Sequence, residues 1–195
     1  MRKAIFVVGP ESSGTRMMTQ FFIPRGYKGG GGHSQPWDDM RFRKYPDRIV
    51  FRRSMPHGGR WPDLVGIVNK MQAARYVVYP IFTWRDPRYM ALSQVNASHV
   101  GNTAEALKNI ALAVTHLDTA FIELGIRPVR VVYEEFISNE SFREALHGLF
   151  TSVDAAPFEV RNENSKYNKS LAKVSERGGL QTVYDSTARS RTLGF

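Results

Sequence analysis

The chain has 195 residues, of which 42% are hydrophobic, so it is long enough to form one domain with a substantial core. Its formal net charge of +9 at pH 7 favours anionic partners, and the absence of cysteine excludes disulfides, thiolate metal sites and cysteine nucleophiles. A short apolar run near the N-terminus leads straight into a glycine loop, so we expect a core strand there, not a signal peptide. We expect a cytoplasmic protein with no membrane-crossing segment.

Strand and helix patterns alternate along the chain. Apolar runs rich in valine and isoleucine predict buried parallel strands over residues 3–8, 49–53, 76–84 and 127–133. Helical periodicity predicts helices over residues 14–23, 62–74, 87–98, 103–124 and 139–150. This alternation predicts an α/β fold, a three-layer parallel sheet with flanking helices, and ligand binding at the C-terminal ends of the strands.

Two stretches lack a regular pattern. Residues 25–45 contain four consecutive glycines, and the densest basic run follows them, from residue 41 to residue 60. That run is either a solvated basic face or a substrate channel. Residues 155–195 are polar and basic, which predicts a solvated tail or a basic lid over a bound anion.

The first candidate site is the loop after the first strand. Gly9 and Gly14 bracket four residues before a predicted helix, and the loop amides and the helix N-terminus together suit a phosphate or sulfate group. The polar side chains of this loop are Ser12, Ser13, Thr15 and Arg16. The glycine spacing is that of a P-loop, but Thr15-Arg16 replaces the expected Lys-Ser/Thr. The loop therefore favours nucleotide binding without Mg²⁺-dependent hydrolysis of a nucleoside triphosphate.

Two further motifs follow at later strand ends. Arg85 ends a predicted strand, Pro87 opens a helix, and Ser93 lies two helical turns further on, so Arg85 and Ser93 can bind one anion. Residues 130–136 predict a strand followed by an acidic turn, in which Tyr133 packs.

Together these three motifs resemble those of sulfotransferases that use 3′-phosphoadenosine 5′-phosphosulfate (PAPS). Residues 9–15 look like the family's 5′-phosphosulfate loop, and Arg85-Asp86-Pro87 with Ser93 matches its 3′-phosphate motif. Residues 132–136 look like its Tyr-Glu-Asp-Leu segment. The resemblance implies a single P-loop NTPase-like domain over residues 1–195, with 25–60 as acceptor-site loops. It implies sulfuryl transfer from PAPS to a hydroxyl or amine of a small-molecule or glycan acceptor, without a metal.

By the family pattern, the cofactor-binding residues are Gly9, Ser12, Ser13, Gly14, Thr15, Arg16, Arg85 and Ser93. The chain departs from the pattern at Ser12, where most relatives have Lys or Arg to stabilise the bridging oxygen. Arg16, Arg52 and Arg53 are the candidates to replace that cation.

The catalytic base has two main candidates. His33 lies close to where some relatives place a glutamate, and a histidine can accept a proton near neutral pH. Residues 52–56 resemble a Lys-Thr-His-X-Pro segment, but Ser54 takes the place of the histidine and His57 follows three residues later. We favour His33 over His57, and place Asp38 and Asp39 behind both.

Three other functions stay open at this point. A P-loop nucleotide or small-molecule kinase would bind Mg²⁺-ATP. A non-catalytic polyanion or nucleic-acid binder would show steeply salt-dependent binding, although nucleic acid is the less expected partner. A degenerate sulfotransferase fold would bind the cofactor without transferring sulfate. The acceptor and the oligomeric state are not readable from the sequence.

Overall fold

The computed structural model describes residues 1–30, 39–57, 59–150 and 158–175. The chain divides into two compact units, Met1–Val160 and Arg161–Phe195. The first unit contains the sheet and all three sequence motifs. Within the second unit, a 3-10 turn at Ser165–Tyr167 leads into α7 (Asn168–Ser175).

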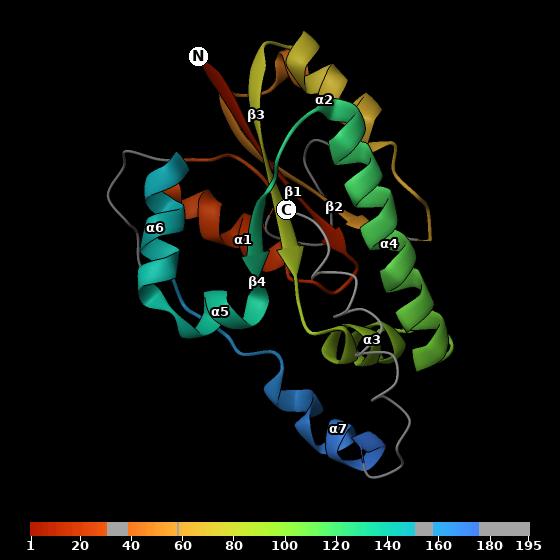
Figure 1. Cartoon of the computed structure of the whole chain (residues 1–195). Helices are drawn as coiled ribbons and strands as arrows, with labels where there is room; N and C mark the ends of the chain where they lie inside the picture. The colour runs from red at the N-terminus through yellow and green to blue at the C-terminus, as the bar shows by residue number, and fades with distance from the viewer. Residues whose placement is uncertain (31–38, 58, 151–157, 176–195) are drawn as a thin grey trace. The chain divides into compact units, whose positions relative to one another are not determined.

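The core of the first unit is a parallel sheet of four strands in the order β2-β1-β3-β4 (Figure 1). The strands are β1 (Arg2–Pro10), β2 (Arg48–Met55), β3 (Tyr76–Trp84) and β4 (Val129–Val132). The expectation of an α/β fold built on a parallel sheet is confirmed. The first strand is central, so the loop that follows it emerges in the middle of the sheet edge, between the ends of β2 and β3.

Helices cover both faces of this sheet. The helices of the first unit include α1 (Thr15–Phe22), α2 (Leu64–Ala73), α3 (Pro87–Asn96), α4 (Thr103–Leu124), α5 (Tyr133–Ser138) and α6 (Glu140–Phe150), of which α3 packs against α4. One apolar cluster joins the sheet to α2 and α4, and a second joins it to α1, α5 and α6. Figure 1 shows these helix groups on opposite sides of the strands. The result is a three-layer arrangement with two apolar interfaces.

The structure corrects two local predictions. The fourth strand ends at Val132, and Tyr133–Ser138 form the short helix α5 instead of an acidic turn. Tyr133 and Phe136 are buried one helical turn apart, and Glu134 and Glu135 lie in the first turn, where acidic side chains favour a helix. The C-terminal segment, expected to be irregular, contains α7.

In the part of the chain that the structure describes, none of the helices has the length and apolar composition needed to span a membrane.

Candidate anion-binding site

The loop between β1 and α1 has a backbone suited to anions. Ser12 and Gly14 adopt left-handed conformations, with φ of 70° and 101°. The Ser13 amide donates to the Pro10 carbonyl at 3.1 Å, and the Glu11 amide donates to the Met55 carbonyl at 2.9 Å. Left-handed residues before a helix N-terminus are typical of anion-binding concavities, and the first turn of α1 contains no acidic residue to compensate the positive end of its dipole.

The start of the loop is packed tightly against β3. The Ser13 hydroxyl hydrogen-bonds with the Thr83 hydroxyl at 2.7 Å, and Thr83 Oγ1 donates to the Val8 carbonyl at 3.2 Å. A Cβ atom on Gly9 would collide with the Ser13 hydroxyl and with the backbone oxygen of Thr83. Glycine is therefore required at position 9, and the Ser13 side chain, 1% exposed, holds the loop against the neighbouring strand.

Arg85 joins the three sequence motifs. Its side chain lies at the end of β3 and is 4% exposed. Its Nη1 donates to the Ser12 carbonyl at 3.3 Å, and its guanidinium lies 4.7 Å from the centre of the Tyr133 ring. The same ring lies 3.0 Å from where a Cβ atom on Gly14 would stand. The loop, the end of β3 and the start of α5 thus contact one another, as expected for motifs at adjacent parallel strand ends.

Helix α3 is attached to the loop from the other side. Gln94, 1% exposed, donates from Nε2 to the Glu11 carbonyl at 2.9 Å. Its neighbour Ser93 is half-buried on the same helix. Asp86 caps this helix by accepting from the Arg88 amide at 2.9 Å, and its own amide donates to Glu134 at 3.2 Å. The Arg-Asp-Pro motif therefore positions α3 as well as Arg85.

A carboxylate–imidazole pair lies beside the loop. Glu11 Oε2 and His99 Nδ1 are 3.2 Å apart. Burial raises the pKa of the Glu11 carboxyl, and this effect outweighs the lowering by His99. Sequence reasoning missed this pair, because nothing along the chain links the loop to the residues after α3. It also missed Thr83 and Gln94, although a polar residue one position before the end of a buried strand was a usable signal for Thr83.

The two arginines of β2 lie on opposite faces of the sheet. Arg52 is in register with Val7 and Arg53 with Val8. Val7 belongs to the apolar cluster packed by α1, and Val8 to the cluster packed by α2 and α4. Because registered residues of parallel strands share a face, Arg52 lies on the α1 side of the sheet. Arg53 lies on the other side, 4.3 Å from the centre of the Phe51 ring, and both arginines are 7% exposed.

His57 lies just beyond the end of β2. Its Nδ1 is 3.1 Å from the Ser54 hydroxyl, and Ser54 is in register with Gly9. Backbone hydrogen bonds of 2.7 and 3.1 Å also join His57 and Arg60. His57 is thus held close to the first residue of the candidate loop.

The other candidate bases and the first residues of α1 complete the predicted site. His33 and Asp38 lie outside the described residues. Asp39 is exposed and paired with Arg41, whose backbone amide and guanidinium lower the pKa of this carboxyl and make it a weaker base. Thr15 is buried in the first turn of α1, whereas Arg16 is exposed.

The chain matches no family model and no curated protein. Within the described ranges, no group of three or more histidine and acidic side chains is arranged to hold a metal ion.

Proposed function

We propose that the protein is a PAPS-dependent sulfotransferase whose cofactor site is the loop at residues 9–16 together with Arg85 and Ser93. The observation that carries the proposal is the position of Arg85. A buried guanidinium contacts both the glycine loop and Tyr133, so three motifs far apart in the chain surround one cation. A buried arginine beside a loop of this backbone type favours a ligand with more than one anionic group.

The division of roles follows from the positions of these groups. The loop amides and the N-terminus of α1 would hold the 5′-phosphosulfate, because they offer donors and a positive dipole end. Arg85 and Ser93 would hold the 3′-phosphate, since the strand end and the helix flank lie beside the loop. The hydroxyl of Ser13 is engaged with Thr83, so its contribution to the ligand would come through loop shape.

Arg52 is our candidate for the cation that replaces the usual Lys or Arg at Ser12. It shares the α1 face of the sheet with the loop, whereas Arg53 lies on the opposite face. A guanidinium there would stabilise negative charge developing on the leaving phosphate oxygen. Arg16, exposed in the first turn of α1, is the alternative.

His57 is the candidate base among the described residues. Its contact with Ser54 through Nδ1 fixes the orientation of the ring, and an imidazole is the commonest general base in proteins. In an in-line displacement, the acceptor oxygen would bond to sulfur as the bond from sulfur to the phosphate oxygen breaks. The acceptor proton would pass to His57, and the electron pair would stay on the phosphate. His33 remains the competing prediction.

Calorimetry with 3′-phosphoadenosine 5′-phosphate tests the cofactor site. We expect saturable binding that Arg85→Ala weakens at least tenfold, on the order of 1.4 kcal/mol. The matched control is Arg130→Ala, which removes the same charge from an exposed arginine on β4. Absence of binding to the wild-type protein, equal loss in both variants, or tighter binding of Mg²⁺-ATP would overturn the proposal, the last in favour of a kinase.

Turnover with labelled PAPS and a panel of alcohols, amines and glycans tests the chemistry. We expect Arg52→Met to lower kcat by roughly a hundredfold or more with little change in nucleotide affinity. Arg53→Met is the control, because Arg53 is as buried as Arg52 but lies on the other face of the sheet, and it should retain most of the activity. His57→Gln and His33→Gln decide between the two bases: the one that keeps full activity is excluded.

A further inference from the structure

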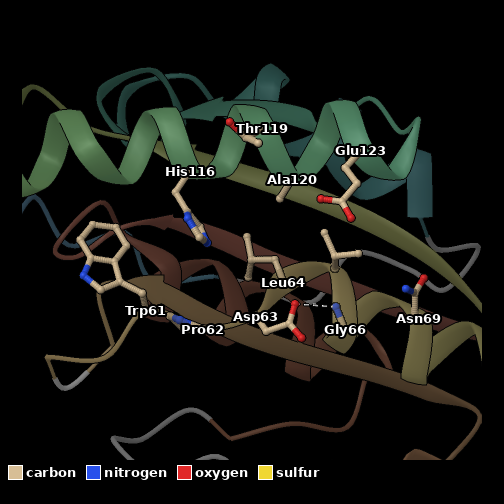
Figure 2. Close-up of a pocket in the computed structure, with 11 residues that line it drawn as sticks. Trp61, Pro62, Asp63, Leu64, Gly66, Asn69, His116, Thr119, Ala120 and Glu123 are labelled. Carbon is tan, nitrogen blue, oxygen red and sulfur yellow. Dashed lines mark hydrogen bonds between the residues drawn. The ribbon is translucent and has the colours of Figure 1, made fainter.

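A groove between α2 and α4 lies apart from the loop site (Figure 2). Its volume is about 580 Å³, within the usual range for small-molecule sites. It shares none of its lining residues with the loop at residues 9–16, with Arg85 or with Ser93. The proposed sulfotransferase activity therefore leaves the groove unexplained.

The middle of the groove is lined by small residues, one from each helix. Gly66 of α2 contributes no side chain, and Ala120 of α4 contributes only a methyl group. Leu64 is a buried lining residue, and Asp63 is turned back to accept from the Gly66 amide at 2.8 Å. Figure 2 shows this cap contact on the α2 side of the groove.

One end of the groove is aromatic. Trp61 is 42% exposed, and its ring centre lies 5.8 Å from that of His116, with the planes tilted by 56°. An exposed indole at the end of a hollow offers a flat face on which a ring can pack or near which a cation can bind.

The other end is polar and acidic. Figure 2 shows the Glu123 carboxylate directed from α4 toward α2 at this end, with Asn69 on the opposite wall, whereas the His116 ring points toward α2 at the aromatic end. His116 and Glu123 are seven residues apart on α4, so the two ends are separated by about 10 Å along the helix. Asp63 and Glu123 both line the groove, and among its described lining residues none is lysine or arginine. In a chain of net charge +9, this is a locally acidic hollow.

We propose that this groove binds a small organic amine that carries a ring able to pack against an indole. The ring lies against Trp61, and the ammonium group, a few bonds away, reaches Glu123, with Asn69 as a further hydrogen-bonding partner. The acidic lining excludes the anions that the rest of the surface attracts. The ring is either aromatic or a sugar, since an aromatic ring and the C–H face of a pyranose chair can both pack against an indole.

Titration followed by the indole N–H signals in a nitrogen–proton correlation spectrum tests this proposal. The Trp61 signal is the one that disappears in Trp61→Phe. The probes are phenethylamine, 2-phenylethanol and 3-phenylpropionate, which share a ring and differ in charge. We expect the amine to shift the Trp61 signal saturably, with a dissociation constant at least tenfold below that of the alcohol, and the carboxylate to produce no saturable shift.

Glu123→Gln should reduce the affinity for phenethylamine to that for the alcohol. The control is Glu144→Gln, which removes the same charge from an exposed position on α6 and should change nothing. Equal affinity for amine and alcohol, an unchanged amine affinity in Glu123→Gln, or no saturable shift by any amine up to about 10 mM would overturn the proposal.

A second pair of probes distinguishes the two kinds of ring. Tighter binding of the glucosamine disaccharide than of cellobiose would identify the ligand as an amino sugar. Binding of phenethylamine without binding of the glucosamine disaccharide would identify it as an aromatic amine. These titrations do not use PAPS. A negative result therefore does not contradict the proposed sulfotransferase function, and a negative result for that function does not contradict amine binding in the groove.

Discussion

At the scale of single residues, Tyr27 shows how one buried hydroxyl connects distant parts of the first unit. Its side chain is fully buried, its hydroxyl donates to the Phe150 carbonyl at 2.8 Å, and its ring packs edge-on against Phe22. Burial raises the pKa of the Tyr27 phenol, and the guanidinium of Arg48 offsets this only in part. Tyr27 therefore joins the segment after α1 to the end of α6.

We expect Tyr27→Phe to lower the free energy of unfolding by about 1–2 kcal/mol near neutral pH, because the Phe150 carbonyl loses a buried donor. The sign of the pH effect follows from the raised pKa. Above about pH 10 the unfolded chain loses the phenolic proton while the folded protein retains it, so stability falls as pH rises. Burial also raises the pKa of Tyr76, which adds to this loss. The free energy of unfolding, measured with urea at pH 8 and at about pH 10.5, should fall less between these two pH values in Tyr27→Phe than in the wild type. Equal decreases would show that the Tyr27 phenol does not cause the loss.

Gly9→Ala tests the tight contact between the loop and β3. The added methyl group meets the backbone oxygen of Thr83, which cannot rotate away, so we expect a loss of about 2–3 kcal/mol in stability and weaker nucleotide binding. Gly148→Ala is the control, since nothing lies within 4 Å of its Cβ position on α6. That change should stabilise the protein by up to about 1 kcal/mol through helix propensity. If Gly9→Ala left the stability unchanged, the contact between the loop and β3 would not be tight.

At the scale of elements, side-chain caps mark where α2, α3 and α4 begin. Asp63 caps α2, Asp86 caps α3, and Asn102 caps α4 by accepting from the Glu105 amide at 2.9 Å. Each cap satisfies an amide that the helix itself leaves without a carbonyl partner. These short polar residues were visible in the sequence directly before each apolar pattern.

Asp63→Ala should cost about 1 kcal/mol in thermal or urea unfolding, because the Gly66 amide loses its acceptor. Asp63→Asn keeps an oxygen acceptor and should cost much less. If both substitutions cost the same, the charge of Asp63, and not the cap hydrogen bond, stabilises the start of α2.

At the scale of the whole molecule, the sheet couples two apolar clusters that lie on its opposite faces. Phe51 belongs to the cluster under α2 and α4, and Phe136 to the cluster under α1, α5 and α6. Alternate residues of the same strands supply both clusters, so neither face can lose its packing without disturbing the strands that serve the other. The first unit should therefore unfold as one cooperative body.

Phe51→Leu and Phe136→Leu should each lower the stability by about 1–2 kcal/mol and shift a single transition. For each of the three proteins, circular dichroism and tryptophan fluorescence should report the same transition midpoint as each other. Two separated transitions in either variant would show that the faces unfold independently.

The sequence alone determined where most of the strands and helices fall along the chain, and it identified the loop at residues 9–16. These features depend on local periodicity, on glycine spacing and on caps, all of which are written within a few consecutive residues. Prediction failed at Tyr133–Ser138, where a six-residue segment has too little periodicity to separate a turn from a helix, and burial of Tyr133 and Phe136 decided the outcome.

Only the tertiary structure decided which side chains meet. It brought Arg85 to Ser12 and Tyr133, paired Glu11 with His99, and attached α3 to the loop through Gln94. It also separated Arg52 from Arg53, because strand register assigns neighbouring residues to opposite faces of a sheet. These relations depend on strand order, register and helix packing, which join residues far apart in the chain and leave no local trace in the sequence.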